Sequence, residues 1–144
     1  SPHKLEQSKM DSSSPKAIFG PTNPNPTERE ESKVKRFASV IGLCPEKEAY
    51  YRELHANVWP SILEHIKLAN LQNFSIHLTE IEGKKYLFSY YEYTGIHYEE
   101  DMKLMETKPE MQRWWKETSP CQFLLPNTKT GKQWKETEML FQLG

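Results

Sequence analysis

Apolar residues recur with two different periods along residues 34–144, and the alternation between these periods predicts strands and helices. The stretch VKRFASVIGL, from Val34, is rich in β-branched and aromatic residues and predicts a strand. Pro45 is typical of a helix start, and apolar side chains then recur at helical spacing to about Ala69. This pattern predicts one long amphipathic helix.

Residues 71–93 predict a hairpin. In LQNFSIHLTEI, Phe74, Ile76 and Leu78 share one face, EGKK makes a turn, and YLFSYYEY predicts the second strand. A helix is predicted from about Tyr98, interrupted near Pro109, and restarted by a capping box in TKPE. Residues 119–133 predict a polar loop, and KETEMLFQLG predicts a closing strand.

The predicted order is βαββαβ, an α+β arrangement of ferredoxin-like type with both helices on one face of an antiparallel sheet. The other face would be bare and partly apolar, and such a face usually finds a partner. The pattern therefore predicts a homodimer built sheet to sheet. Residues 1–33 are rich in Ser, Pro, Asn and charge, which predicts a tail or linker before a domain at 34–144.

Composition narrows the classes of partner. The 144 residues carry a net charge of −1 with both signs interspersed, which argues against binding nucleic acid or an acidic membrane surface. No apolar run is long enough to span a membrane, and the first residues lack the pattern of a signal peptide. We expect a cytoplasmic protein, although an exported or tethered form through the tail stays open.

The sequence offers no recognised metal or cofactor motif. It lacks a phosphate-binding glycine loop, a nucleophile elbow and a His/Cys/Asp cluster with metal-ligand spacing. Cys44 and Cys121 are expected to be free thiols, although a single long-range disulfide stays open. What remains is an acid–base site without metal or cofactor.

The stretch HANVWP, residues 55–60, carries the most informative chemistry. Tyr51, His55 and Trp59 follow one another at intervals of four residues, so they share one side of a helix. An indole packs on the C–H face of a sugar, while a phenol and an imidazole bond to its hydroxyls. Imidazole also titrates near neutrality, which suits proton transfer. The alternative is a partly buried histidine with a purely structural partner.

Two further features are open to more than one interpretation. Pro60 either ends one helix and starts another or kinks a single helix so that His55 and Trp59 face a cavity. In QRWW, Trp114 and Trp115 point about 100° apart, so one indole can pack in the core while the other lines a pocket. Of the aromatic residues on the third strand, at most one or two hydroxyls should reach a ligand.

Five segments in register together resemble the L-rhamnose mutarotase family: YRELHANVWP, QNFSIHL, LFSYYE, QRWW and MLFQL. The resemblance covers residues 34–144. It implies a ferredoxin-like subunit paired into a dimeric α/β barrel, and an isomerase that interconverts the α and β anomers of L-rhamnose without cofactor. It makes His55 the proton donor and makes Tyr51, Trp114 and Trp115 sugar-binding residues.

The sequence departs from this family at one position, where Phe74 replaces a sugar-binding tyrosine. The ring remains but the hydroxyl is lost, and a hydroxyl that bonds a sugar discriminates strongly among substrates. Another deoxy sugar or a uronate is therefore an alternative to L-rhamnose, and a tyrosine from the third strand is a candidate to restore the contact. The competing functions are a non-catalytic sugar-binding or dimeric interaction module and, as a third class, a cofactor-free oxygenase or heme-binding protein on the same fold.

Overall fold

The computed structural model describes residues 15–144, so residues 1–14 of the predicted tail lie outside the described part. The chain divides into two compact units, one formed by residues up to Glu31 together with Met139–Gly144, the other by Ser32–Glu138. The first unit contains helix α2 (Pro26–Glu31), which the sequence pattern did not predict. Within it, the Gln142 amide donates to the Thr22 carbonyl at 2.7 Å. The predicted boundary after residue 33 stays a prediction.

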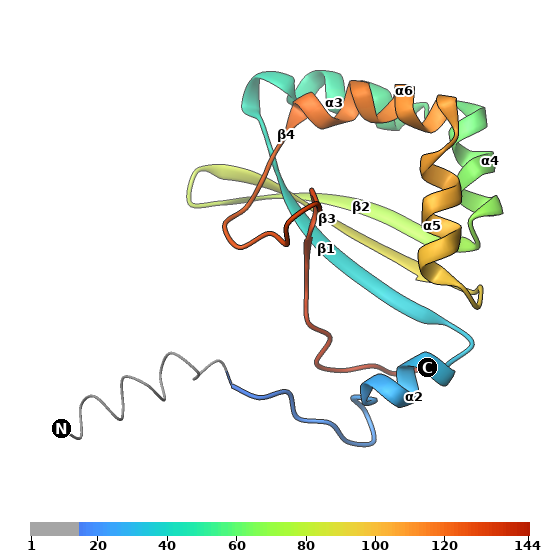
Figure 1. The fold of residues 1–144 in the computed structure, drawn as a ribbon. Coiled ribbons are helices and arrows are strands. Elements are labelled where there is room, and N and C mark those ends of the chain that lie inside the picture. The colour runs from blue at the N-terminus through green and yellow to red at the C-terminus, as the bar shows by residue number, and fades with distance from the viewer. Residues whose placement is uncertain (1–14) are drawn as a thin grey trace. The chain divides into compact units, whose positions relative to one another are not determined.

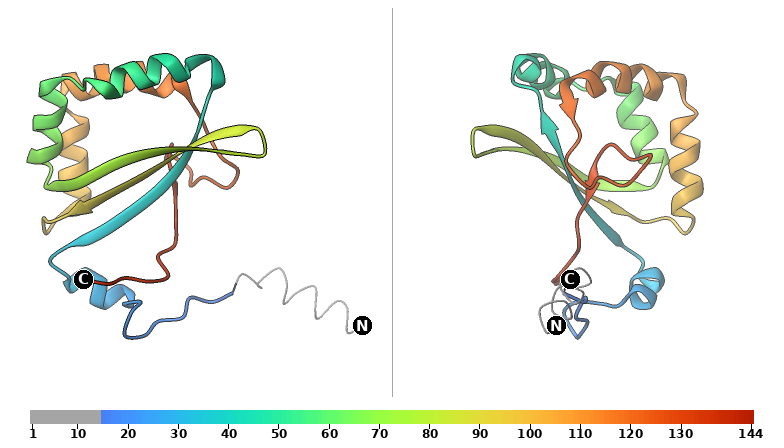
Figure 2. Two further views of the ribbon diagram at one scale, coloured as in Figure 1. Left: turned by 180° about the vertical axis from the view of Figure 1, so that it is seen from behind. Right: turned by 60° about the vertical axis from the view of Figure 1, so that its left-hand side comes forward.

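The second unit is a mixed α+β structure around one antiparallel sheet (Figure 1). The strands follow the order β2-β3-β1-β4, and β5 also pairs with β1. Helices α3–α6 all cover one face of the curled sheet, as both further views agree (Figure 2). The strands are β1 (Lys35–Leu43), β2 (Leu71–Ile81), β3 (Lys84–Tyr93), β4 (Gln122–Phe123) and β5 (Lys135–Glu136). The helices are α3 (Glu48–Ala56), α4 (Pro60–Leu68), α5 (Tyr98–Glu106) and α6 (Pro109–Thr118), with short 3-10 turns at Pro45–Lys47 and Ser119–Cys121.

The helix-facing side of the sheet holds much of the core. Ile41 and Leu43 of β1 and Leu87 of β3 are each no more than 2% exposed, and they cluster with Tyr51 of α3. Alternation along a strand sends every second residue to the same face. The residues between these core positions therefore form the opposite side of the sheet.

We call that opposite side the outer face and define it by Val40, Tyr86, Phe88 and Phe123. Phe88 lies opposite Val40 in the β1–β3 register and is 37% exposed. The rings of Tyr86 and Phe123 lie 6.0 Å apart across Gly42. A Cβ at Gly42 would come within 2.2 Å of the Phe123 ring, so glycine is the residue that fits there.

Several predicted elements are confirmed and some are wrong. The first strand, the β2–β3 hairpin, and the pair of helices either side of Pro109 are present. The single helix predicted up to Ala69 is wrong, because α3 ends at Ala56 and α4 begins at Pro60. Of the two interpretations of Pro60, the one in which it starts a second helix is confirmed. The pyrrolidine ring takes the first position of α4, where its missing N–H costs no helical hydrogen bond. The predicted capping box is also wrong: Lys108 is the cap of α6, and the Thr107 hydroxyl donates to the Leu104 carbonyl.

The C-terminal prediction needs a larger correction. Of the predicted strand KETEMLFQLG, only Lys135–Glu136 pair as β5, although the Thr137 amide still donates to the Ala38 carbonyl at 3.1 Å. The predicted loop at residues 119–133 contains the short strand β4. Apolar alternation in the last residues predicts a strand. Whether the segment pairs with another strand depends on distant parts of the chain, which its own sequence does not show.

Candidate functional site

His55 and Tyr51 lie together on α3, one helical turn apart. Their rings stack with centroids 4.1 Å apart, and His55 Nδ1 lies 2.9 Å from the Tyr51 carbonyl oxygen. A carbonyl only accepts hydrogen bonds, so Nδ1 carries the proton of this contact. In neutral His55 this assignment leaves Nε2 unprotonated, with a lone pair free to accept a proton.

Burial sets the proton affinities of this pair. It lowers the pKa of His55 below its ordinary value of 6.5, against a smaller opposing effect of the bond to the Tyr51 carbonyl. It raises the pKa of Tyr51 to about 12, although the amide of Gln122 that faces the phenol acts in the opposite direction. The pair therefore presents a neutral imidazole beside a neutral phenol at neutral pH.

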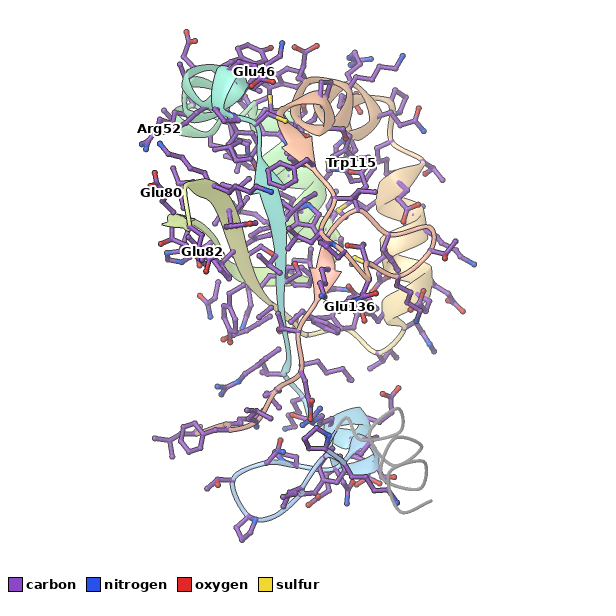
Figure 3. The ribbon with its side chains drawn as sticks, turned by 90° about the vertical axis from the view of Figure 1, so that its left-hand side faces the viewer. Glu46, Arg52, Glu80, Glu82, Trp115 and Glu136 are labelled. Atoms are coloured by element: carbon purple, nitrogen blue, oxygen red, sulfur yellow. The ribbon has the colours of Figure 1, made fainter. Side chains whose placement is uncertain are left out.

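Two tryptophans extend this ring cluster. The predicted single helical side for Tyr51, His55 and Trp59 is wrong for Trp59, because α3 ends at Ala56 and Trp59 contacts Trp114 instead. Trp114 of α6 lies edge-on to His55 with ring centroids 5.3 Å apart, and Trp59 lies edge-on to Trp114 at 5.1 Å. Trp114 is only 6% exposed, so it packs in the core. Trp115, labelled in Figure 3, is partly buried and packs against the same cluster. As the next residue of α6, it points about 100° away from Trp114.

The structure places Phe74 in a different ring cluster from His55. A bulge between Gln72 and Ser75 interrupts the β2–β3 register, and Asn73 within it has a φ of 48°. Phe74 is 41% exposed, and its ring lies 5.2 Å from that of Tyr91 on β3. The hydroxyl of Tyr91 in turn bonds to that of Tyr98 on α5. The position of the family tyrosine thus contacts a tyrosine from the next strand.

Sequence reasoning missed several polar groups on the helix-facing side. The hydroxyls of Ser39 and Ser89 bond at 2.7 Å across β1 and β3, and Glu136 lies opposite Ser39 on β5. Strand alternation in YLFSYYEY places Ser89 and Tyr91 on the face of Leu87, and this signal was available. The position of Glu136 was not, because it depends on long-range pairing of a two-residue strand.

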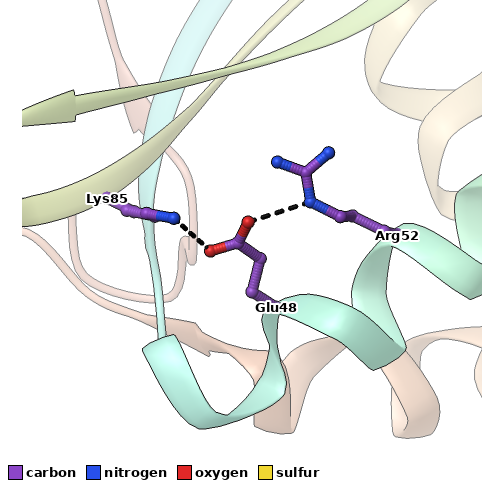
Figure 4. A network of polar contacts seen from close by, with 3 residues as sticks. All are labelled: Glu48, Arg52 and Lys85. Carbon is purple, nitrogen blue, oxygen red and sulfur yellow. Dashed lines mark hydrogen bonds and ion pairs between the residues drawn. The ribbon is translucent and has the colours of Figure 1, made fainter.

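A charged clamp anchors the helix that carries His55. The Glu48 carboxylate at the start of α3 accepts from Lys85 of β3 at 2.5 Å and from Arg52 at 2.9 Å (Figure 4). These two bonds hold the pKa of Glu48 below its ordinary value. The clamp ties α3 to the β2–β3 hairpin and so helps to fix the position of Tyr51 and His55 over the sheet.

Over residues 15–144 we find no group of three His, Cys, Asp or Glu side chains arranged to hold a metal ion. None of the described helices is long and apolar enough to cross a membrane. Cys121 is buried and Cys44 partly buried, and both thiols are free.

Comparison with known proteins gives a consistent result. Residues 36–143 match the sequence profile described as L-rhamnose mutarotase. The chain is 34% identical over 87 residues to the L-rhamnose mutarotase of Bacillus subtilis (strain 168), which covers 60% of this chain and 79% of that protein. It is 31% identical over 94 residues to the L-rhamnose mutarotase of Listeria monocytogenes serovar 1/2a (strain EGD-e), which covers 65% and 86%.

A solved structure also resembles the fold. The crystal structure of an L-rhamnose mutarotase from Formosa agariphila superposes with a TM-score of 0.57 at 18% identity. The superposition covers 76% of this chain and 99% of that one. At this identity the likeness concerns the fold alone.

Proposed function

Since the chain belongs to the L-rhamnose mutarotase family, we propose that it is a carbohydrate isomerase that interconverts the α and β anomers of L-rhamnose or a closely related sugar. The observation that carries this proposal is the position of His55, which is half-buried and stacked on Tyr51 within the matched region. Such an imidazole supplies the proton transfer that the reaction needs.

Mutarotation moves two protons around one carbon atom. The anomeric hydroxyl loses its proton, the bond between C1 and the ring oxygen breaks, and the ring oxygen takes up a proton. The C1 carbonyl of the open aldehyde then rotates, and the reverse steps close the ring on the other face. An acid–base group placed beside C1 accelerates each of these steps, typically by about 10²–10⁴-fold.

We propose that His55 delivers the proton to the ring oxygen. Because Nδ1 bonds the Tyr51 carbonyl, Nε2 is the nitrogen left for the sugar. In its neutral form Nε2 first accepts the proton of the anomeric hydroxyl, and the resulting imidazolium then donates to the ring oxygen. Both oxygens are attached to C1, so one nitrogen can serve them in turn.

The remaining candidates are proposed as sugar-binding residues. Tyr51 keeps its phenol neutral and able to donate, since burial raises its pKa to about 12. Trp59, Trp114 and Trp115 belong to the apolar cluster next to His55, and Phe74 offers its ring from β2. Aromatic surfaces of this kind suit the C–H face of a deoxy sugar.

The decisive experiment measures anomer exchange directly. Two-dimensional exchange NMR on L-rhamnose gives the rates of α-to-β and β-to-α conversion with and without protein. The proposal expects rates that rise in proportion to protein concentration and an unchanged anomer ratio, because a catalyst does not move the equilibrium. Saturation-transfer signals from bound sugar without faster exchange would contradict catalysis and indicate a sugar-binding module instead.

We further propose that the subunit is ferredoxin-like and pairs through its outer face into a dimeric α/β barrel. The apolar side chains of that face support this, since Phe88 is 37% exposed among the neighbouring Val40, Tyr86 and Phe123. An uncovered apolar sheet face is a common site of self-association. A cytoplasmic location fits such an enzyme of sugar metabolism and is proposed with it.

A further inference from the structure

The helix-facing side of the sheet turns polar at its centre, where a plain core would stay apolar. Ser39 and Ser89 lie opposite each other there, their hydroxyls 2.7 Å apart, and Ser89 is only 6% exposed. Glu136 pairs with Ser39 from the other side of β1, and directly opposed residues share a face. A row of two hydroxyls and one carboxylate therefore crosses three strands beneath the helices.

A phenol lies in the next row of the same face. Tyr91 opposes Phe37 in the register, and both rings stack at 5.3 Å. Its hydroxyl bonds to that of Tyr98. This pair holds two O–H groups and its mutual bond uses one of them, so one O–H remains for a ligand.

Glu136 supplies a free acceptor beside these phenols. It is exposed, and its negative charge adds to burial in raising the pKa of both Tyr91 and Tyr98. The phenols consequently stay protonated and able to donate. In the view of Figure 3, Glu136 lies between the β1 ribbon and α5, the side on which Trp115 also lies.

The polar row is continuous with the neighbourhood of His55. Trp134, two residues before Glu136 and on the same face, packs against the core cluster that contains Tyr51. Tyr51 stacks directly on His55 at 4.1 Å. The segment that carries Glu136 and the helix that carries His55 thus both pack against this core cluster, through Trp134 and Tyr51 respectively.

We propose that Tyr91 and Glu136 bind hydroxyl groups of the sugar on which His55 acts, and that the site takes a neutral monosaccharide rather than a uronate. A carboxylate accepts strongly from sugar hydroxyls and repels a second carboxylate. Lysines on this face are already engaged: Lys35 donates to the Ser32 carbonyl and Lys85 to Glu48. This inference rests on the proposed mutarotase function.

The test compares kinetic constants for anomer exchange in the full chain with L-rhamnose and galacturonate. Tyr91→Phe should raise KM for L-rhamnose by about 3- to 10-fold, the value of one neutral hydrogen bond. Glu136→Gln should raise it by about 10-fold or more, and should narrow the preference of the protein for L-rhamnose over the uronate. Tyr90→Phe and Glu138→Gln are matched controls that should stay within twofold of wild type.

The outcomes separate this inference from the proposed function. Wild-type protein that accelerates no sugar overturns both. Active wild type whose KM stays within twofold in both variants, or whose substrate preference is unchanged by Glu136→Gln, overturns the binding assignment and leaves the mutarotase function standing. Thermal unfolding followed by circular dichroism identifies any variant that misfolds, and Glu136→Asp, which keeps the charge, should then retain the preference for the neutral sugar.

Discussion

At the scale of single residues, the proposed role of His55 makes activity depend on the protonation state of its imidazole. Burial holds its pKa below 6.5, so the neutral form prevails at neutral pH and is lost only as the pH falls through that lowered pKa. We expect kcat for L-rhamnose exchange to be constant near neutrality and to fall on acidification with a midpoint below 6.5. A rate that rises on acidification would show that His55 must enter the reaction already protonated.

Removal of the imidazole should abolish most of the catalysis. His55→Ala is expected to lower the protein-catalysed exchange rate by about 10²–10⁴-fold, the usual contribution of a positioned acid–base group. His97→Ala changes an exposed histidine at the start of α5 and is the control that should leave the rate unaltered. Exchange NMR at one protein concentration measures both variants, and equal loss in the two would contradict the role of His55.

The hydroxyl that Phe74 lacks can be restored at position 74 or supplied by Tyr91 on the neighbouring strand. Because Tyr91 already offers a phenol 5.2 Å from the Phe74 ring, Phe74→Tyr alone should change KM for L-rhamnose by less than about threefold. In the Tyr91→Phe background the same substitution should recover part of the lost affinity. Independent, additive effects of the two changes in a double-mutant cycle would contradict a shared binding role.

Part of the site could be predicted from the sequence for a simple reason. Tyr51 and His55 are separated by one turn of α3, and such neighbours are fixed by local geometry. Trp59 lies beyond the end of α3, so its contact with Trp114 does not follow from that spacing. Glu136 and Tyr91 reach the same face of the sheet only through strand pairing between distant segments, and no local pattern encodes that pairing. For the adjacent tryptophans in QRWW, helical geometry predicted that one indole can pack in the core but not which one. The structure buries Trp114, with its ring against that of His55.

At the scale of elements, hydrophobic spacing predicted the type of most helices and strands but not their limits. Apolar spacing continues through Asn57–Trp59, so it could not show that α3 ends there and α4 begins at Pro60. Helical periodicity shows only which face of a helix is apolar. When two successive helices both bury an apolar face, the apolar spacing continues across the break and does not reveal it. The short strand β4 was not predicted, because two residues are too few to show an alternation of apolar and polar side chains.

The backbone strain at the bulge in β2 can be measured through the free energy of unfolding of variants at Asn73. Asn73 has a φ of 48°, and its amide donates to Glu92 at 2.8 Å. Asn73→Ala should lower the free energy of unfolding by about 1–2 kcal/mol, since residues other than glycine and asparagine resist this conformation. Asn73→Gly loses the same hydrogen bond without the steric cost and should lie closer to wild type in urea titrations. Equal losses in the two variants would contradict a strain origin.

At the scale of the whole molecule, the outer face predicts the oligomeric state. Wild-type protein should have twice the mass of one chain by light scattering after size exclusion. Phe88→Lys places a charge in the centre of the apolar face and should give the mass of a single chain, because burial of an unpaired ammonium is costly. Phe88→Leu keeps the face apolar and should remain dimeric. A monomeric wild type would contradict the sheet-to-sheet assembly.

The pairing of β5 with β1 joins segments almost a hundred residues apart in the chain. Loop-closure entropy delays such contacts during folding, and so short a strand contributes little to hold itself in place. The edge that carries Glu136 should thus be the last part of the sheet to dock and the first to detach. Sugar affinity should then disappear at a lower urea concentration than the far-ultraviolet circular dichroism signal, and coincident transitions would contradict this order. If sugar affinity is lost first, substrate recognition depends on complete folding. A chain whose β5 has not yet paired with β1 holds His55 in place but not Glu136, the proposed second sugar-binding side.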